Sequence, residues 1–222
     1  MLDWLSYSIE DFLMFSPETY YRMVEALHGW LWPLHILIFV VIIVLGINGR
    51  QYVGKWTVLL FGLSWLFVGV VFFYYQFAPI FWAADYIALA FVAQGLLLIV
   101  TTFLTRNFIE DSQQAGKLAI YSLMAVALLF FPVSTIISGR SLVTSDFVFV
   151  TPDPTVVATF SLLCALRSPW WMFPVPILWS VFSGLLLYAM ESPWFWIVPL
   201  SAIFAVIIRV MPPNLELLLN KL

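Results

Sequence analysis

The amino-acid sequence predicts an all-α membrane protein, a bundle of about seven membrane-crossing helices with one short, broken span and an N-terminal amphipathic helix. Three observations lead to this fold class. Of 222 residues, 64% are hydrophobic and only 9% are charged, whereas a water-soluble domain carries roughly a quarter charged residues. Several apolar runs approach the roughly 20 residues that a helix needs to cross a bilayer. Many of the eleven Trp residues lie at the ends of those runs, as in an aromatic belt.

The N-terminal segment predicts a helix that does not cross the membrane. Ser16 and Pro17 are typical of a helix start, and Glu18 places an acid at the positive end of the helix dipole. The following helix is amphipathic and too polar to cross, so we expect it to lie flat on the membrane interface. Composition thus divides the chain into an interfacial helix, a transmembrane bundle and a short tail, at residues 1–29, 30–211 and 212–222.

Six apolar segments are predicted to cross the membrane, and a seventh is ambiguous. The six are residues 30–47, 56–75, 82–104, 118–137, 170–190 and 194–210. The seventh, residues 155–166, would form only about 18 Å of helix. Before it, Thr151-Pro152-Asp153-Pro154 breaks any continuing helix, which predicts a broken span. Backbone groups freed at that depth have to be buried in protein or face a watery cavity.

The distribution of Lys and Arg tests whether the short segment crosses. With seven crossings and the N-terminus outside, the basic residues collect in the cytoplasm, where they are Arg50, Lys55, Arg106, Lys117, Arg167, Arg209 and Lys221. Only Arg22 and Arg140 remain outside. If the segment turned back, this bias would vanish. We therefore expect seven crossings, with the N-terminus out and the C-terminus in.

Several classes of function find no support in the sequence. The net charge of −3 is small and scattered, which argues against a nucleic-acid partner. Cys164 is the only cysteine, so a disulfide within the chain or a CxxC redox pair is excluded. No Ser-His-Asp set, phosphate loop, HExxH motif or catalytic carboxylate pair can be assembled. We therefore expect neither an enzyme nor a cofactor.

The strongest candidate for a solute site is the break before the short segment. Asp153 has the position and chemistry of a helix N-cap. It either only caps the helix or also binds a solute where the helix N-terminus is directed into the membrane. Thr151 and Thr155 add hydroxyl groups beside it.

Two further polar residues lie in the segment 82–104. Gln94, near its middle, either makes a helix-to-helix hydrogen bond or lines a pore. Asp85, one turn inside, is either an interfacial acid at a helix N-terminus or a proton or cation ligand near one mouth. Nine residues separate them, which puts them on opposite sides of a helix, so we do not expect one shared site.

Glu25, His28 and His35 form a weak metal candidate. Their spacing places them on one stripe of a continuous helix, and carboxylate and imidazole are metal ligands. Two His residues alone do not build a typical site, and hydrogen-bonded His side chains are the alternative. We therefore predict no metal.

Three stretches resemble an uncharacterised family of bacterial multi-pass membrane proteins, classed as a domain of unknown function. They are WLWPLH at 30–35, the region 64–94 with WLFVG and FVAQG, and TPDPTVVATFSLL with PVPILWS within 151–180. The resemblance implies a bacterial inner (cytoplasmic) membrane location and no particular activity. Residues 60–68 and 91–93 bear a fainter likeness to the acid-activated urea and amide channel family, which uses six spans and an aromatic-lined pore.

Two functional classes fit these observations. The first is a channel or permease for a small, uncharged or weakly polar solute, which needs a narrow lining of aromatic rings and a few polar groups. The second is a non-catalytic accessory subunit of a larger membrane protein complex. Membrane lipids are the expected surroundings in both cases, with further copies of the chain or other membrane subunits as partners.

Overall fold

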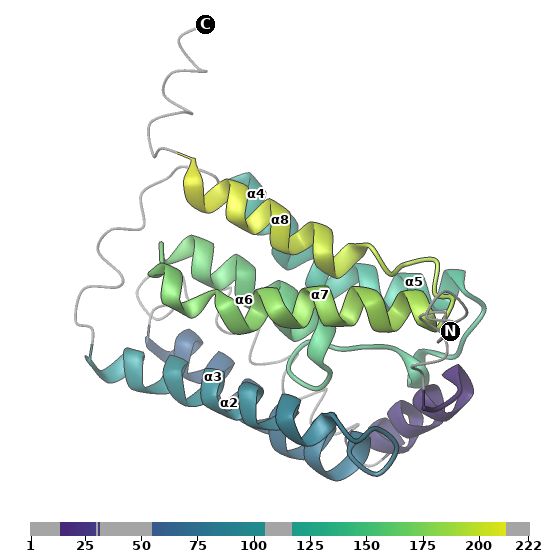
Figure 1. Ribbon diagram of the computed structural model, residues 1–222. Coiled ribbons are helices and arrows are strands. Elements are labelled where there is room, and N and C mark those ends of the chain that lie inside the picture. The colour runs from purple at the N-terminus through teal and green to yellow at the C-terminus, as the bar shows by residue number, and fades with distance from the viewer. Residues whose placement is uncertain (1–13, 30, 32–54, 105–116, 212–222) are drawn as a thin grey trace, which may run out of the picture.

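The computed structural model describes residues 14–29, 31, 55–104 and 117–211, and all regular structure in these ranges is helical (Figure 1). The all-α prediction is therefore confirmed for this part of the chain. The predicted span 30–47 except residue 31, His35 within it and the tail 212–222 lie outside the described residues.

One layer of the fold is a pair of antiparallel helices. The first is α2 (Lys55–Phe67), which continues without a break as the π-helix η3 (Val68–Phe77), and the second is α3 (Ala84–Leu104). Gly62 and Gly95 let the two backbones touch. A Cβ atom on Gly95 would lie 2.8 Å from the carbonyl oxygen of Gly62, so a larger residue would push the helices apart, as at small-residue contacts in membrane bundles.

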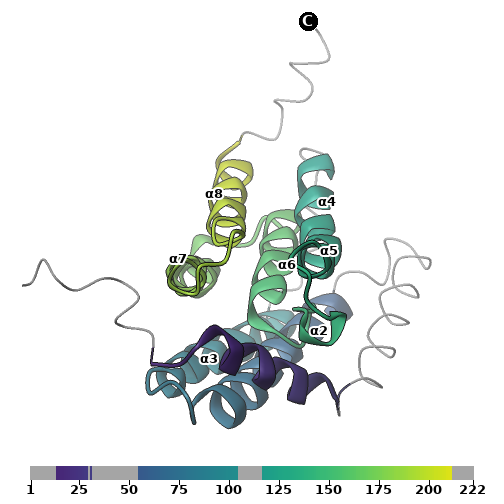
Figure 2. The ribbon, with the colours of Figure 1, turned by 90° about the vertical axis from the view of Figure 1, so that its right-hand side faces the viewer.

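The other helices form a second group around α6 (Pro152–Ala165) (Figure 2). On one side lies a continuous helix made of α4 (Lys117–Ala125), the π-helix η4 (Val126–Phe130) and α5 (Phe131–Ile137). On the other side lie α7 (Pro174–Ala189) and α8 (Ile197–Val210). Both α6 and α7 begin at a proline, whose fixed φ suits the first helical position.

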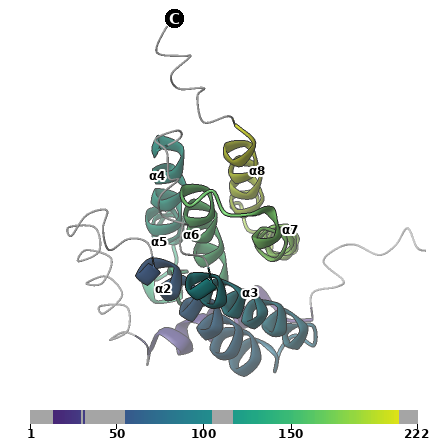
Figure 3. The same cartoon turned by 90° about the vertical axis from the view of Figure 1, so that its left-hand side faces the viewer.

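The short segment predicted after the proline break is the core of the molecule. Every residue of α6 from Pro152 to Cys164 is buried, and the helix contacts α2, α4, η4, α7 and α8. Figure 3 views the molecule from the opposite end and also shows α6 with other helices around it. The expectation that backbone near this break is covered by protein is met, because other helices surround α6 on all these sides.

Three helices are long and apolar enough to cross a membrane by length and composition: Lys55–Phe77, Ala84–Leu104 and Ala119–Ile137. Two shorter apolar helices are Pro174–Ala189 and Ile197–Val210. Each of these helices overlaps a segment predicted to cross. The described part is therefore an all-helical protein with membrane-spanning candidates, and the number of seven crossings stays a prediction.

The helix of residues 17–29 covers one end of the bundle (purple in Figure 2). Its predicted start is confirmed, because the Ser16 hydroxyl accepts the N–H of Thr19 at 3.3 Å. The sequence predicts that the apolar face of this helix contacts the membrane interface, whereas in the structure this face packs against the protein. Tyr20 is buried and its ring lies 5.9 Å from that of Phe77, so the protein covers this face and Glu25 lies on the exposed one.

The two ends of the bundle differ in charge within the described residues. The end covered by the helix of residues 17–29 carries Arg22, Arg140 and the acids, which are Glu18, Glu25, Asp85, Asp146, Asp153 and Glu191. At the opposite end (left in Figure 1) the described charges are basic, namely Lys55, Lys117, Arg167 and Arg209. Antiparallel packing of alternate helices therefore sorts the charges as the positive-inside argument requires.

Candidate functional site

Asp153 is buried at the start of α6, with 5% of its surface exposed. The N-cap residue is Thr151, whose backbone is extended (φ −114°, ψ 156°). Pro152 takes the first helical position because its φ is already helical, and this puts Asp153 inside the first turn. The prediction that Asp153 caps α6 is therefore wrong by two residues. The acid still lies where the helix dipole favours a negative charge.

The Asp153 carboxylate is held by α7. Trp179 Nε1 donates to Asp153 Oδ1 at 2.9 Å, and Ser183 Oγ donates to the same oxygen at 2.7 Å. Trp179 and Ser183 are four residues apart, so they share one face of α7. The two donors fix the carboxylate in one orientation and stabilise its charge, although none of the described basic residues is in direct contact with it.

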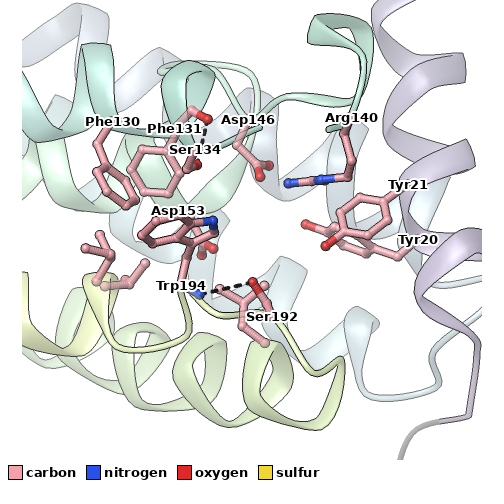
Figure 4. Close-up of a pocket in the computed structure, with 13 residues that line it drawn as sticks. Tyr20, Tyr21, Phe130, Phe131, Ser134, Arg140, Asp146, Asp153, Ser192 and Trp194 are labelled. Atoms are coloured by element: carbon pink, nitrogen blue, oxygen red, sulfur yellow. Dashed lines mark hydrogen bonds between the residues drawn. The ribbon is translucent and has the colours of Figure 1, made fainter. Parts of the chain in front are cut away.

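A small cavity of about 30 Å³ lies beside this carboxylate (Figure 4). Such a volume holds about two water molecules. The cavity is bounded by the helix of residues 17–29, the end of the α4–α5 helix, the segment before α6, and the turn between α7 and α8. Its lining residues are Tyr20, Tyr21, Phe130, Phe131, Ser134, Arg140, Asp146, Asp153, Leu187, Ser192, Trp194, Ile197 and Val198.

Arg140 extends over the cavity with its guanidinium stacked on an aromatic ring. Its Cζ atom lies 3.9 Å from the centroid of the Tyr21 ring, a cation–π contact. In Figure 4 the guanidinium points toward the Asp146 carboxylate. Arg140 Nη1 is buried and has no hydrogen-bond partner among the described residues. Arg140 therefore lines the cavity and keeps a strong donor that the described residues do not satisfy.

Asp146 supplies the matching acceptor. Its Oδ1 atom is buried and likewise lacks a hydrogen-bond partner in the part of the chain that the structure describes. Burial raises the pKa of the Asp146 carboxyl to about 7, and the nearby Asp153 carboxylate raises it too, while Arg140 and the Thr151 hydroxyl oppose this. The cavity therefore contains a carboxyl group that changes charge near neutral pH.

The hydroxyl groups predicted to assist Asp153 have another role. Thr151, Thr155 and Thr159 follow at intervals of four, and the last two each donate at 2.7 Å to the carbonyl one turn back. Each of the three also accepts a hydrogen bond, from Phe147 N at 2.9 Å, Phe149 N at 2.8 Å and Trp65 Nε1 at 2.8 Å, respectively. These hydroxyls are therefore satisfied within the chain.

The threonines fix the turn that leads into α6. Phe149 in this turn has a φ of 72°, a left-handed conformation that a bulky residue adopts only when its surroundings impose it. The Thr155 hydroxyl accepts the N–H of Phe149, and the Phe149 ring packs edge-on to Phe61 at 5.0 Å. Thr151 and Thr155 thus position the segment that carries Asp146, and neither lines the cavity.

Gln94 and Asp85 are separate from the cavity and from each other. Gln94 is 1% exposed, and its Nε2 donates to the Met172 carbonyl at 3.1 Å, which is the helix-to-helix hydrogen bond considered from the sequence. Asp85 is exposed in the first turn of α3. Neither residue is in contact with the cavity beside Asp153. The expectation that the two do not share a site agrees with these positions.

Aromatic side chains fill the bundle beyond Asp153. The Trp179 ring lies 5.0 Å from that of Phe73 and 5.3 Å from that of Phe91, and the Trp65 ring lies 4.4 Å from that of Phe91. These side chains come from α2, η3, α3 and α7 and are all buried. The polar cavity therefore borders a packed aromatic layer on the side of Trp179.

The weak metal candidate is not assembled by the described residues. Glu25 is exposed, whereas His28 is buried and its Nδ1 lies 2.8 Å from the carbonyl oxygen of Val143. His35 is outside the described residues. Among the side chains that the structure places, no group of three His, Cys, Asp or Glu residues could hold a metal ion.

Sequence reasoning missed half of this site. Arg140 was interpreted only as an orientation signal, and Asp146, Tyr21 and Ser183 were not singled out. One signal was available, because Asp146 is an acid next to an apolar run and only seven residues before Asp153. Contact of Arg140 with Tyr21 joins residues more than 100 positions apart, and no local pattern announces such a pair.

Comparison with known proteins gives one match. A family model described as "Family of unknown function (DUF6064)" matches residues 17–215, most of the chain. No curated protein and no solved structure matches. The resemblance to an uncharacterised family is therefore confirmed, whereas the likeness to urea and amide channels gains no support.

Proposed function

This chain belongs to the Family of unknown function (DUF6064), and we propose that it is an integral membrane channel or permease for a small, uncharged or weakly polar solute that binds beside Asp153. One observation carries the proposal. Arg140 and Asp146, from the segment between α5 and α6, and Asp153, from α6, line one cavity, and buried polar atoms of the first two have no partner among the described residues. Polar groups kept unsatisfied in a membrane protein are costly, and they commonly mark a pathway or binding site.

We place the cavity on the outer side of a bacterial inner membrane. The end of the bundle with Lys55, Lys117 and Arg209 then faces the cytoplasm, in keeping with the positive-inside rule. In this orientation the protein crosses seven times, with α6 as the short span, and the helix of residues 17–29 covers the outer mouth. We place the packed rings of Trp65, Phe91 and Trp179 between the cavity and the inner side.

The charges of the cavity favour a solute without net charge. Two carboxyl groups face one guanidinium, and the Asp146 carboxyl is only partly ionised near pH 7. The charges therefore nearly cancel, so an ion of either sign would meet a group of like charge as well as one of opposite charge. The volume of about 30 Å³ limits the solute to a few heavy atoms.

Solute flux across proteoliposomes tests the proposal. We expect the reconstituted full chain to speed the equilibration of small neutral solutes over protein-free vesicles, measured by stopped-flow light scattering. Asp153→Ala should lower this flux at least tenfold at equal amounts of folded protein. Glu18→Gln is the matched control, because it removes an exposed acid at the same end of the bundle; its flux should equal that of the parent chain.

Two results would contradict the proposal. Normal flux in Asp153→Ala would remove this cavity from the pathway. Absence of flux in the parent chain, together with extraction from the native membrane in a fixed ratio with another membrane protein, would instead identify an accessory subunit. A homo-oligomer extracted alone agrees with the channel.

A further inference from the structure

Arg140 and Asp146 face the same cavity without closing on each other. In the described part of the chain the two residues form no ion pair, because no guanidinium nitrogen of Arg140 lies within 4.0 Å of a carboxylate oxygen of Asp146. A buried guanidinium nitrogen and a buried carboxylate oxygen normally satisfy one another. Here both residues line the same small cavity and each keeps one buried polar atom without a partner, so a solute in that cavity that reached these atoms would complete both.

The surrounding contacts hold the two groups apart. The Arg140 guanidinium is stacked on Tyr21, whose helix is tied to the segment before α6 by the His28 contact with Val143. Asp146 lies next to a turn that Thr151 fixes, because its hydroxyl accepts the N–H of Phe147. Both side chains are thus placed by contacts behind them, and such preorganised groups bind without a large ordering cost.

We infer that the cavity recognises a neutral carboxamide-type group, whose carbonyl oxygen accepts from Arg140 Nη1 while its N–H donates to Asp146 Oδ1. This inference deepens the proposed function and rests on it for the role of the cavity as a solute site. A carboxamide presents an acceptor and a donor on one carbon atom, so a single small group meets both open atoms. An undissociated carboxylic acid offers the same pattern, and the test below separates it.

Ions fit the same space less well. A carboxylate solute would satisfy Arg140 but would face Asp146 and Asp153 with a lone pair toward each, and neither could donate when ionised. A guanidinium or ammonium solute would satisfy the carboxylates but would direct N–H groups at Arg140 Nη1. A ketone would leave Asp146 Oδ1 without a donor, and a buried polar atom left unpaired strongly disfavours the wrong solute.

Four planar solutes of nearly equal size isolate the hydrogen-bond pattern from shape: acetamide, acetone, acetate and guanidinium. Their binding to the detergent-purified full chain is measured by titration calorimetry, with saturation-transfer NMR for the weaker ones. We expect acetamide to bind with Kd on the order of millimolar, as suits so small a ligand. The other three should bind at least tenfold more weakly. The affinity for acetate, measured at pH 5 and at pH 8, shows whether undissociated acetic acid binds at the same site.

Two substitutions should change which of the four solutes the protein prefers to bind. Asp146→Asn replaces a carboxylate by a group that also donates, so acetate should bind at least tenfold more tightly than to the parent chain. Arg140→Gln removes the guanidinium, so guanidinium should gain in the same way. A substitution that merely loosened the fold would weaken all four solutes, and Glu18→Gln should change none of them.

Binding and flux separate this inference from the proposed function. If acetamide binds as expected but no solute crosses proteoliposomes, the carboxamide site stands and the permease does not. If solutes cross but none of the four binds to the parent chain, or if acetone equals acetamide, the carboxamide inference is overturned and the space holds water only. Unchanged preferences in Asp146→Asn and Arg140→Gln would overturn it as well.

Discussion

Two groups of polar side chains in and next to α6 differ in whether the chain itself completes their hydrogen bonds. In the first group, the hydroxyls of Thr151, Thr155 and Thr159 each donate and accept within the protein. In the second, Asp146 and Arg140 beside the Asp153 cavity each keep a buried atom without a partner among the described residues. Of these residues, the sequence singles out only Thr151 and Thr155 as solute ligands, and not Arg140 or Asp146.

The difference teaches which buried polar groups are structural. A satisfied hydroxyl contributes to the fold and has nothing left for a ligand, whereas an unpaired buried atom costs free energy that a ligand can recover. Asp153 lies between these cases. One of its oxygens is held by Trp179 and Ser183, so this residue both fixes α7 against α6 and borders the cavity. Substitutions of the threonines should therefore lower the stability of the fold and leave solute binding unchanged, whereas substitutions at the cavity should change solute binding.

The largest effect is expected at Asp153, where both roles meet. Asp153→Ala leaves the Trp179 N–H and the Ser183 hydroxyl buried without an acceptor, and we expect a loss of about 3 kcal/mol in the free energy of unfolding. Asp153→Asn keeps an acceptor for these donors and should lose clearly less. The apparent melting temperature in detergent measures both. Equal losses in the two variants would show that the hydrogen bonds from α7 contribute little.

A smaller effect, confined to stability, is expected at the threonines. Thr155→Val leaves the buried N–H of Phe149 without its acceptor, which should cost about 1–3 kcal/mol. Thr102→Val is the matched control, since the Thr102 hydroxyl also donates to the carbonyl one turn back but accepts no hydrogen bond from the described residues. Acetamide binding per folded protein should stay within about twofold of the parent chain. A loss of binding in Thr155→Val without a loss of stability would place this hydroxyl in the solute site.

The smallest effect is the pH dependence that Asp146 confers. Folding raises its pKa from 3.8 to about 7, so the folded state binds a proton more tightly than the unfolded state. The stability from this proton is fully present below pH 3.8 and is lost as the pH rises through 7. Between pH 5 and pH 8 the melting temperature of the parent chain should therefore fall more than that of Asp146→Asn.

We expect that difference to be several degrees, because each kcal/mol shifts the melting temperature of a chain of this size by about 2–4 °C. The other titratable and charged groups that face Asp146 are Asp153, Arg140, Tyr20 and Tyr21, and both proteins retain them. Identical pH profiles for the two proteins would show that Asp146 keeps an ordinary pKa, with its carboxyl accessible to water.

Local sequence signals predicted the fold well where they were strong. The segments 56–75 and 82–104 correspond to helices within a few residues, because long apolar runs flanked by Trp leave a helix as the only way to satisfy their backbone. The proline pair at 152 and 154 placed a helix start close to that of α6, which begins at Pro152 where the sequence predicts residue 155. The same signal misplaced the cap by two residues, because Pro152 takes the first helical position and Asp153 then lies inside the first turn.

By itself, the sequence determined that this protein is helical, apolar and sorted in charge between its two ends, because these properties follow from composition and from the spacing of charges along each run. Only the tertiary structure decided which polar groups remain open. Arg140 is stacked on Tyr21, and Ser183 donates to Asp153, and both pairs exist because helices distant in sequence pack side by side. Whether a buried donor or acceptor is satisfied depends on its neighbours in space, which residue type and local spacing do not encode.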